Sequence, residues 1–205
     1  MRPTCLEGIW RVSADADMYG RVKIRDLDFF RTHFVGKPMK SEWHNPTLAM
    51  VPKQPKHADF VSWAAGVLLC SARAKSVLEA RLKDCVEWLP CHMASGELRF
   101  AINVIAMGDR FVDLHATDAL NAGSSVAFLR PRIKFLPDAG RIAPPMFRLQ
   151  LDAPAPYSSH YVNAEVAAVI ASERLKGIDL MNPERDVARA YLRGESMNDY
   201  PGLKA

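Results

Sequence analysis

The chain has 205 residues, of which 49% are hydrophobic and 24% are charged. This length and composition are those of a soluble globular domain with an ample hydrophobic core. The net charge is only +4, and basic residues alternate with acidic ones, as in NPERDVARAYLR over 182–193. A nucleic-acid-binding surface gathers its basic residues in a patch, so we do not expect nucleic acid as a partner.

Neither a membrane span nor a signal peptide is expected. The longest apolar stretch, FVSWAAGVLLC over 60–70, is far shorter than the roughly 20 residues that cross a bilayer. The start of the chain contains no apolar run of signal-peptide length. We therefore expect a cytoplasmic protein without a membrane contact, whose four cysteines are free thiols, as is usual in a reducing compartment.

The stretch over 1–57 predicts an N-terminal arm that packs on the rest of the chain. A strand is indicated near 9–12 and a short helix near 24–33. An irregular segment that carries Trp43 follows, punctuated by four prolines: Pro38, Pro46, Pro52 and Pro55. Such a segment wraps a domain more readily than it folds alone.

A regular core is predicted over 58–181. VLLC over 67–70 is typical of a short buried strand, after which Ser71 caps a helix that continues to about Leu82. A loop is predicted to begin at Pro90. Further strands are predicted over 85–89, 98–107, 109–116, 123–136, 144–151 and 178–180.

A second helix is predicted from the N-cap Asn163 to a C-terminal glycine, Gly177. A last short helix begins at Asn182-Pro183 and stops at Gly194, within a C-terminal part that spans 182–205. Strands follow one another with few helices between them. The sequence therefore predicts an α+β fold with a mostly antiparallel sheet, a few packing helices and an irregular N-terminal arm.

The stretch KDCVEWLPCHM over 83–93 raises the question of a metal site. Structural zinc sites need three or four ligands, commonly as two closely spaced pairs, and the other two cysteines do not supply a second pair. Alternation along a strand places Cys85 on a sheet face, whereas Cys91 and His92 follow Pro90 in a turn. A small core thiol and a loop are therefore favoured, and we expect no bound metal.

Two pairs of residues could nevertheless serve an enzyme. Cys91 beside His92 could provide a nucleophile with its base, although a third, orienting group is needed and none is visible in the sequence. Asp113 and His115, two apart on a predicted strand, would face the same side as an acid–base pair or part of a metal site. Such pairs are more often structural, and the sequence contains no established catalytic or phosphate-binding motif. We therefore do not expect an enzyme or a bound cofactor.

A series of short motifs resembles a known family. In order, these are Gly36-x-Pro38, Trp43, Pro46, Asp59-Phe60, LLCSARAKSVLEA, VEWLP, FAINVI, FVDL, MFRL, YSSHYV and LKGIDL. Their shared order and spacing over residues 34–180 resemble the immunity protein 11 family of bacterial polymorphic-toxin systems. Residues 1–33 and the tail after Leu180 do not share the resemblance.

The resemblance implies a binding protein rather than a catalyst. Members of such families protect the producing cell by occluding a cognate toxin protein, and they offer no catalytic residue to transfer. The matched positions Ser71, Glu87, Pro90 and Gly177 are typical of caps, strand ends and turns, so we expect them to form the scaffold. A generic effector adaptor or chaperone is the alternative binding role.

Contact residues for such a partner are sought among aromatic and basic side chains, which commonly anchor interfaces. The candidates are Trp43, Trp63 and Trp88, together with Phe128, Arg130, Arg132 and Lys134 of the segment FLRPRIKF. Core packing is nevertheless the favoured role for each tryptophan, and a solvated strand face is favoured for the basic segment. Of these, Trp43 and the four residues of the basic segment are our predicted partner-binding set.

Overall fold

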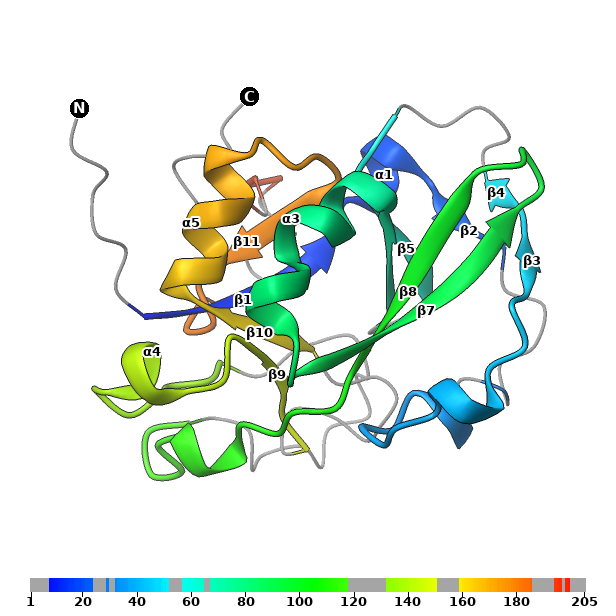
Figure 1. Cartoon of the computed structure of the whole chain (residues 1–205). Helices are drawn as coiled ribbons and strands as arrows, with labels where there is room; N and C mark the ends of the chain where they lie inside the picture. The colour runs from blue at the N-terminus through cyan, green and yellow to red at the C-terminus, as the bar shows by residue number, and fades with distance from the viewer. Residues whose placement is uncertain are drawn as a thin grey trace.

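The structure, a computed structural model, describes residues 8–23, 29, 32–51, 57–64, 67–117, 132–150, 159–185, 194–196 and 198–199. Its strands form two sheets, mostly antiparallel, against which a few helices pack (Figure 1). The predicted α+β class is confirmed, although the strands divide between two sheets rather than forming one. None of the helices in the described part of the chain has the length and apolarity to span a membrane.

The smaller sheet has four strands, all paired antiparallel. Their spatial order is β11 (Ile178–Met181), β1 (Ile9–Ala14), β10 (His160–Asn163) and β9 (Met146–Arg148). The strand predicted near 9–12 is therefore confirmed. This strand, β1, lies inside the sheet between β11 and β10. The sequence alone indicates only an arm that packs on the core for this stretch.

The larger sheet has seven strands. Their order is β3 (Thr47–Leu48), β7 (Val86–Met93), β8 (Leu98–Val104), β6 (Val67–Ser71), β5 (Phe60–Ala64), β2 (Arg21–Val22) and β4 (Met50–Val51). The pairs β3–β7 and β2–β5 are parallel, and the other pairs are antiparallel. The two-residue strands from the predicted arm thus cover both edges of this sheet, which protects it from pairing with other chains.

Two capped helices cover the apolar face that the sheets share. Helix α3 (Ala72–Leu82) begins after Ser71, whose hydroxyl accepts a hydrogen bond from Ala74 N at 3.1 Å. Helix α5 (Ala164–Ser172) begins after Asn163, whose side chain accepts from Val166 N at 3.0 Å. Both N-caps were predictable because the signal is local. The helices lie side by side, and their buried faces join strands of both sheets in one apolar cluster (Figure 1).

Two further clusters lie on the opposite faces. One packs the larger sheet, including Trp63 of β5, against the aromatic residues of the N-terminal stretch, including Phe34 and Trp43. The other packs the smaller sheet against residues 111–112 and 133–143, with Phe147 and Tyr161 at its centre. The remaining described helices are single turns: α1 (Ala16–Tyr19), η1 (Lys40–Glu42), η2 (Asp109–Phe111) and α4 (Ala139–Ile142).

The loop predicted to begin at Pro90 is wrong, because strand β7 continues to Met93. Pro90 is tolerated since its backbone faces away from β8. Its carbonyl accepts from Trp43 Nε1 at 2.7 Å, and two residues later His92 N donates outward to Pro46 O at 2.9 Å. The N–H that proline lacks would have pointed to the same side, so no bond to β8 is lost.

The strand predicted over 109–116 is also wrong. Residues 109–111 form the turn η2, Val112 makes an isolated bridge to Phe135, and 114–116 form a further turn. The Asp113 side chain accepts hydrogen bonds from His115 N at 3.1 Å and Ala116 N at 3.2 Å. Asp competes for backbone donors in this way, and the resulting turn overrides the alternating apolar pattern.

Gly177 does not end α5, which finishes at Ser172 with Arg174 in the left-handed conformation. The φ of Gly177 is +84°, and a Cβ at Gly177 would lie 2.1 Å from Phe60 O. The glycine is thus required by a close approach to β5 rather than by a helix end.

Several predictions lie wholly or partly outside the described residues. For the helix over 24–33, only Phe29, Thr32 and His33 are described, and they are helical. The strand over 123–136 is described only from 132 onward, and the last helix only over 182–185, which form a turn.

Candidate partner-binding site

The structure does not assemble Cys91 and His92 into a reactive pair. Both lie on β7, where neighbouring side chains point to opposite faces. The Cys91 side chain is fully buried, its Sγ donates to Leu89 O at 3.4 Å, and burial raises the pKa of its thiol to about 12. The His92 ring is exposed. A thiol so protonated and enclosed is a core group rather than a nucleophile.

Cys85 lies in the turn before β7 rather than on the strand predicted over 85–89, and it packs in the cluster beneath α3. Burial also raises the pKa of its thiol. Cys70, Cys85 and Cys91 are all free and buried. Within the described ranges, no group of three or more His, Cys, Asp and Glu side chains is placed to hold a metal ion.

Asp113 and His115 do not face one another across a strand. The Asp113 carboxylate is occupied by backbone N–H groups of the following turn, including that of His115 itself. The His115 side chain is exposed. The pair has the geometry of a structural turn rather than of an acid–base pair.

The three candidate tryptophans, Trp43, Trp63 and Trp88, pack against the core. Trp43 is half-buried, donates to Pro90 O, and packs edge-on against Phe34 and Trp63 with ring centroids 6.0 and 6.2 Å away. Trp63 is buried, and Trp88 is half-buried against the cluster beneath α3. Trp43 therefore holds η1 and β3 against the larger sheet, so its role is structural.

The basic segment is described only from Arg132 onward, so Phe128 and Arg130 lie outside the described residues. Ile133 is fully buried, whereas Arg132 and Lys134 on either side of it are exposed. The backbone of Lys134 is held on both sides of its peptide group, because its N–H donates to the Thr117 hydroxyl and its carbonyl accepts from Asp113 N at 2.9 Å. Its ammonium group extends into solvent and makes no ion pair with a described residue.

Exposed apolar side chains lie beside these cations. Leu114, Leu136 and Ile142 are 48%, 41% and 55% exposed. They project from two segments that hydrogen bonds hold together, among them Leu136 N to Phe111 O at 2.9 Å. We call the exposed side chains of Leu114, Arg132, Lys134, Leu136 and Ile142 the contact surface. Apolar groups interspersed with cations on a rigid surface are typical of protein interfaces.

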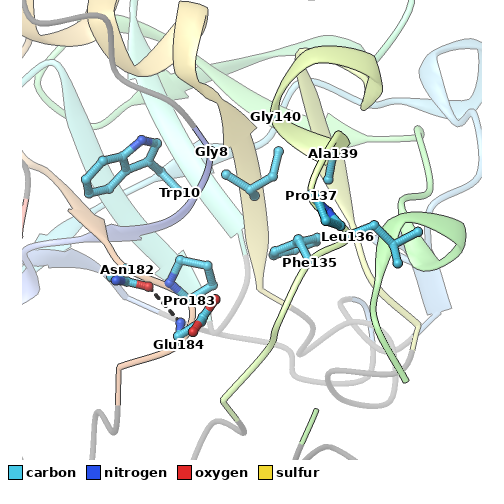
Figure 2. A pocket seen from close by; sticks show the side chains of 11 residues that line it. Gly8, Trp10, Phe135, Leu136, Pro137, Ala139, Gly140, Asn182, Pro183 and Glu184 are labelled. Atoms are coloured by element: carbon cyan, nitrogen blue, oxygen red, sulfur yellow. Dashed lines mark hydrogen bonds between the residues drawn. The ribbon is translucent and has the colours of Figure 1, made fainter. Parts of the chain in front are cut away.

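A pocket of about 290 Å³ opens beside Leu136 (Figure 2). Its walls come from three segments of the chain that are distant in sequence. They are lined by Gly8, Ile9, Trp10, Phe135, Leu136, Pro137, Ala139, Gly140, Asn182, Pro183 and Glu184.

Local packing shapes these walls. Phe135 is fixed edge-on against Tyr161 and Phe147, with ring centroids 5.5 and 6.0 Å away. Gly140 of α4 lies against the backbone of Gly8, and a Cβ at Gly140 would be 2.7 Å from Gly8 N. Any larger residue at this position would push α4 away from the start of β1 and widen the pocket.

The polar side of the pocket is formed by the turn after β11. Asn182 Oδ1 accepts from Glu184 N at 2.9 Å, which shapes the turn (Figure 2). The Glu184 side chain is exposed, and its carboxylate makes no ion pair with a described residue. The pocket thus combines apolar side chains such as Trp10 and Phe135 with the exposed carboxylate of Glu184.

Sequence reasoning identified Lys134 and Arg132 but missed the pocket. Its residues are glycines, prolines and ordinary apolar side chains, and no short motif connects the three segments. No family model matches the chain. A search of curated proteins finds no match either.

Proposed function

We propose that this protein binds a cognate bacterial toxin and neutralises it by stoichiometric occlusion, as an immunity protein of a polymorphic-toxin system. The observation that carries this proposal is the contact surface, where exposed apolar and cationic side chains lie on a hydrogen-bonded frame whose Leu136 also lines a pocket. Such a surface suits a protein partner, because buried apolar anchors and flanking charges together give affinity and rapid association.

The positions that carry the family resemblance support this division between scaffold and surface. Ser71 caps α3, Gly177 accommodates the backbone of β5, and Pro90 O accepts from Trp43. The Glu87 carboxylate accepts from Met39 N at 2.7 Å and from Asn103 Nδ2 at 2.9 Å, which fastens the N-terminal stretch to the larger sheet. A shared scaffold with contact residues elsewhere is what a family of inhibitors needs when each member binds a different toxin.

Neutralisation requires nearly complete capture of the toxin. A Kd of about 1 nM or lower corresponds to a binding free energy of about −12 kcal/mol. An interface of roughly 800 Å² per partner can supply this when a few anchors are fully buried. The contact surface offers three exposed aliphatic groups and an open pocket as such anchors.

The proposal is tested by co-expression with the toxin encoded beside this gene. With the toxin at a fixed level, the amount of this protein is varied through an inducible promoter, and survival is measured. Protection should begin near one copy per toxin molecule, and the two proteins should co-purify as a complex. Cell death despite abundant folded protein, or protection at far below one copy per toxin, would contradict the proposal.

A further inference from the structure

Strands β1 and β11 separate at the pocket. Their last paired residues are Arg11 and Met181. Continuing the same antiparallel register by two residues would place Pro183 opposite Ile9, but the ladder does not extend that far. The pocket lies where this next pair would have formed, since both residues line it.

The backbone of Ile9 faces the side that β11 leaves vacant. Asp15 N donates to Gly177 O, so odd-numbered residues of β1 direct their hydrogen-bonding groups toward β11. The pairing on the other side agrees, because Asn163, opposite Ile9 in β10, donates its N–H away from β1 to Pro145 O. The N–H and C=O of Ile9 therefore point toward the pocket rather than toward β10.

Pro183 cannot satisfy these two groups. It has no N–H to give to Ile9 O, and its carbonyl already accepts from Ile133 N at 2.9 Å. No other described residue is recorded as hydrogen-bonded to the Ile9 backbone, although Ile9 is only 6% exposed. Buried backbone groups are nearly always paired, so an unpaired donor and acceptor at a pocket indicate a ligand that supplies the missing bonds.

The surroundings of Ile9 define the chemistry of that ligand. A donor and an acceptor from one strand residue match the main chain of an added strand, which is how extended peptides bind to sheet edges. The volume of about 290 Å³ is just below the range of roughly 300–1,000 Å³ usual for small-molecule sites, and it suits one apolar side chain. The free carboxylate of Glu184 at the rim favours a basic neighbour.

We propose that the pocket binds an extended peptide segment that continues the line of β11 along β1. The main chain of the segment pairs with Ile9, an apolar side chain fills the space between Trp10 and Phe135, and a basic side chain meets Glu184. This inference rests on the proposed function, since the segment is assigned to the toxin.

The site itself is tested with two blocked tetrapeptides, acetyl-Val-Phe-Val-Arg-amide and acetyl-Val-Phe-Val-Glu-amide, titrated into the isotopically labelled full chain. The arginine peptide should shift the amide resonances of Gly8 and Ile9. It should also bind about three- to tenfold more tightly than the glutamate peptide, as expected when an exposed attractive charge pair is replaced by a repulsive one. Glu184→Arg should reverse this order.

Glu173→Arg is the matched control, because Glu173 is also exposed but lies just beyond the C-terminal end of α5. It should leave both affinities unchanged. Equal binding of the two peptides, or no shift at Ile9 up to about 5 mM peptide, a concentration that would reveal even millimolar affinity, would overturn the proposal.

The assignment to the toxin is tested separately. In the co-expression assay, Glu184→Arg should weaken protection and toxin binding, whereas Glu173→Arg should not. If the unmodified chain fails to protect, the proposed function fails, and the peptide titration still decides whether the pocket binds peptide. If the unmodified chain protects and Glu184→Arg binds toxin equally well, the toxin does not occupy the pocket. Conversion of a dimer to a monomer by Glu184→Arg would identify a second copy as the occupant and would likewise overturn the proposal.

Discussion

The carboxylate of Asp59 accepts a hydrogen bond from the Ser71 hydroxyl at 2.9 Å, which joins the start of β5 to the N-terminus of α3. Its other oxygen accepts from Arg73 Nη1 at 3.0 Å and from Lys176 N at 2.9 Å. Lys176 precedes β11 of the smaller sheet. One buried carboxylate therefore connects the two sheets and a helix cap.

We expect Asp59→Ala to lower the free energy of unfolding by about 3–5 kcal/mol, because buried donors lose their acceptor. Chemical denaturation monitored by circular dichroism measures the change. Asp113→Ala is the control, since that side chain accepts only from an exposed turn and should cost about 1 kcal/mol or less. Equal losses for the two variants would show that Asp59 does not connect the sheets.

Gly177 and Gly96 both have a positive φ, but only Gly177 lies close to other atoms, so alanine substitutions at the two positions distinguish the cost of backbone strain from the cost of a steric clash. At Gly177 an added Cβ would meet Phe60 O at 2.1 Å, whereas at Gly96 it would meet no atom within 4 Å. Gly96→Ala should cost only the left-handed strain of about 1–2 kcal/mol. Gly177→Ala should cost at least about twice as much, because β5 must also move. Thermal unfolding of the two variants provides the comparison, and similar melting temperatures would contradict the close approach.

Asp179 on β11 should make stability depend on pH. Burial, and then the charges of Asp15 and Asp199, raise the pKa of its carboxyl from its ordinary value near 3.8 to about 6. The folded state thus holds its proton to higher pH than the unfolded state does, so this group lowers stability as pH rises from about 4 to about 6.

Asp179→Asn should therefore stabilise the protein at pH 7 by on the order of 2–3 kcal/mol and change little below pH 4. Urea denaturation at a series of pH values measures this difference. Asp138→Asn is the control for removing a carboxylate, because Asp138 is exposed before α4 and pairs with the exposed Arg141 there. A constant difference between wild type and Asp179→Asn across the range would contradict the raised pKa.

The buried thiols should be unreactive until the protein unfolds. Burial raises the pKa of Cys91 to about 12 and also raises that of Cys70. In a Cys5→Ser variant, the remaining thiols should react with an aromatic disulfide reagent at pH 8 more than about a hundredfold slower than in denaturant. Adding Leu136→Cys to that variant provides the exposed control, which should react at once. Rapid modification of the Cys5→Ser protein would contradict the packing of β6 and β7.

Local signals made part of this fold predictable. Ser71 and Asn163 cap their helices through their own side chains, and the periodic apolar residues that follow define the buried faces. The strand over 67–70 is a continuous apolar run, and the strand over 98–104 is a largely apolar run. Each pattern can be recognised without knowing which strands lie beside it in the sheet. These elements follow from a few adjacent residues, so a single sequence suffices to find them.

Elements that depend on distant residues were not predictable. Pro90 continues β7 only because Trp43 and Pro46 supply its outer partners. The pocket exists because Pro183 is opposite Ile9 in the register, a relationship between residues at the two ends of the sequence. Lys134 could be identified as basic, but the pocket that the next two residues, Phe135 and Leu136, help to line could be found only from the fold.

Lys134 should contribute to the rate of toxin binding. Its ammonium is exposed, and its backbone is fixed by Thr117 and Asp113, so the charge is presented at a defined place on the contact surface. Lys134→Glu should slow association with the toxin by roughly three- to tenfold at low salt, because steering by surface charges acts mainly on the on-rate. The dissociation rate should change much less.

The rates are measured by surface-based binding kinetics with immobilised toxin at low and high salt. Salt should reduce the difference between wild type and Lys134→Glu, because charges separated by more than the Debye length of about 8 Å at physiological ionic strength are screened. Lys23→Glu is the control for the change in net charge, since Lys23 is exposed and directly follows β2 of the larger sheet. If both variants slow association equally, net charge alone sets the rate. If neither does, the toxin binds away from the contact surface, and the place assigned to Lys134 at the interface is wrong.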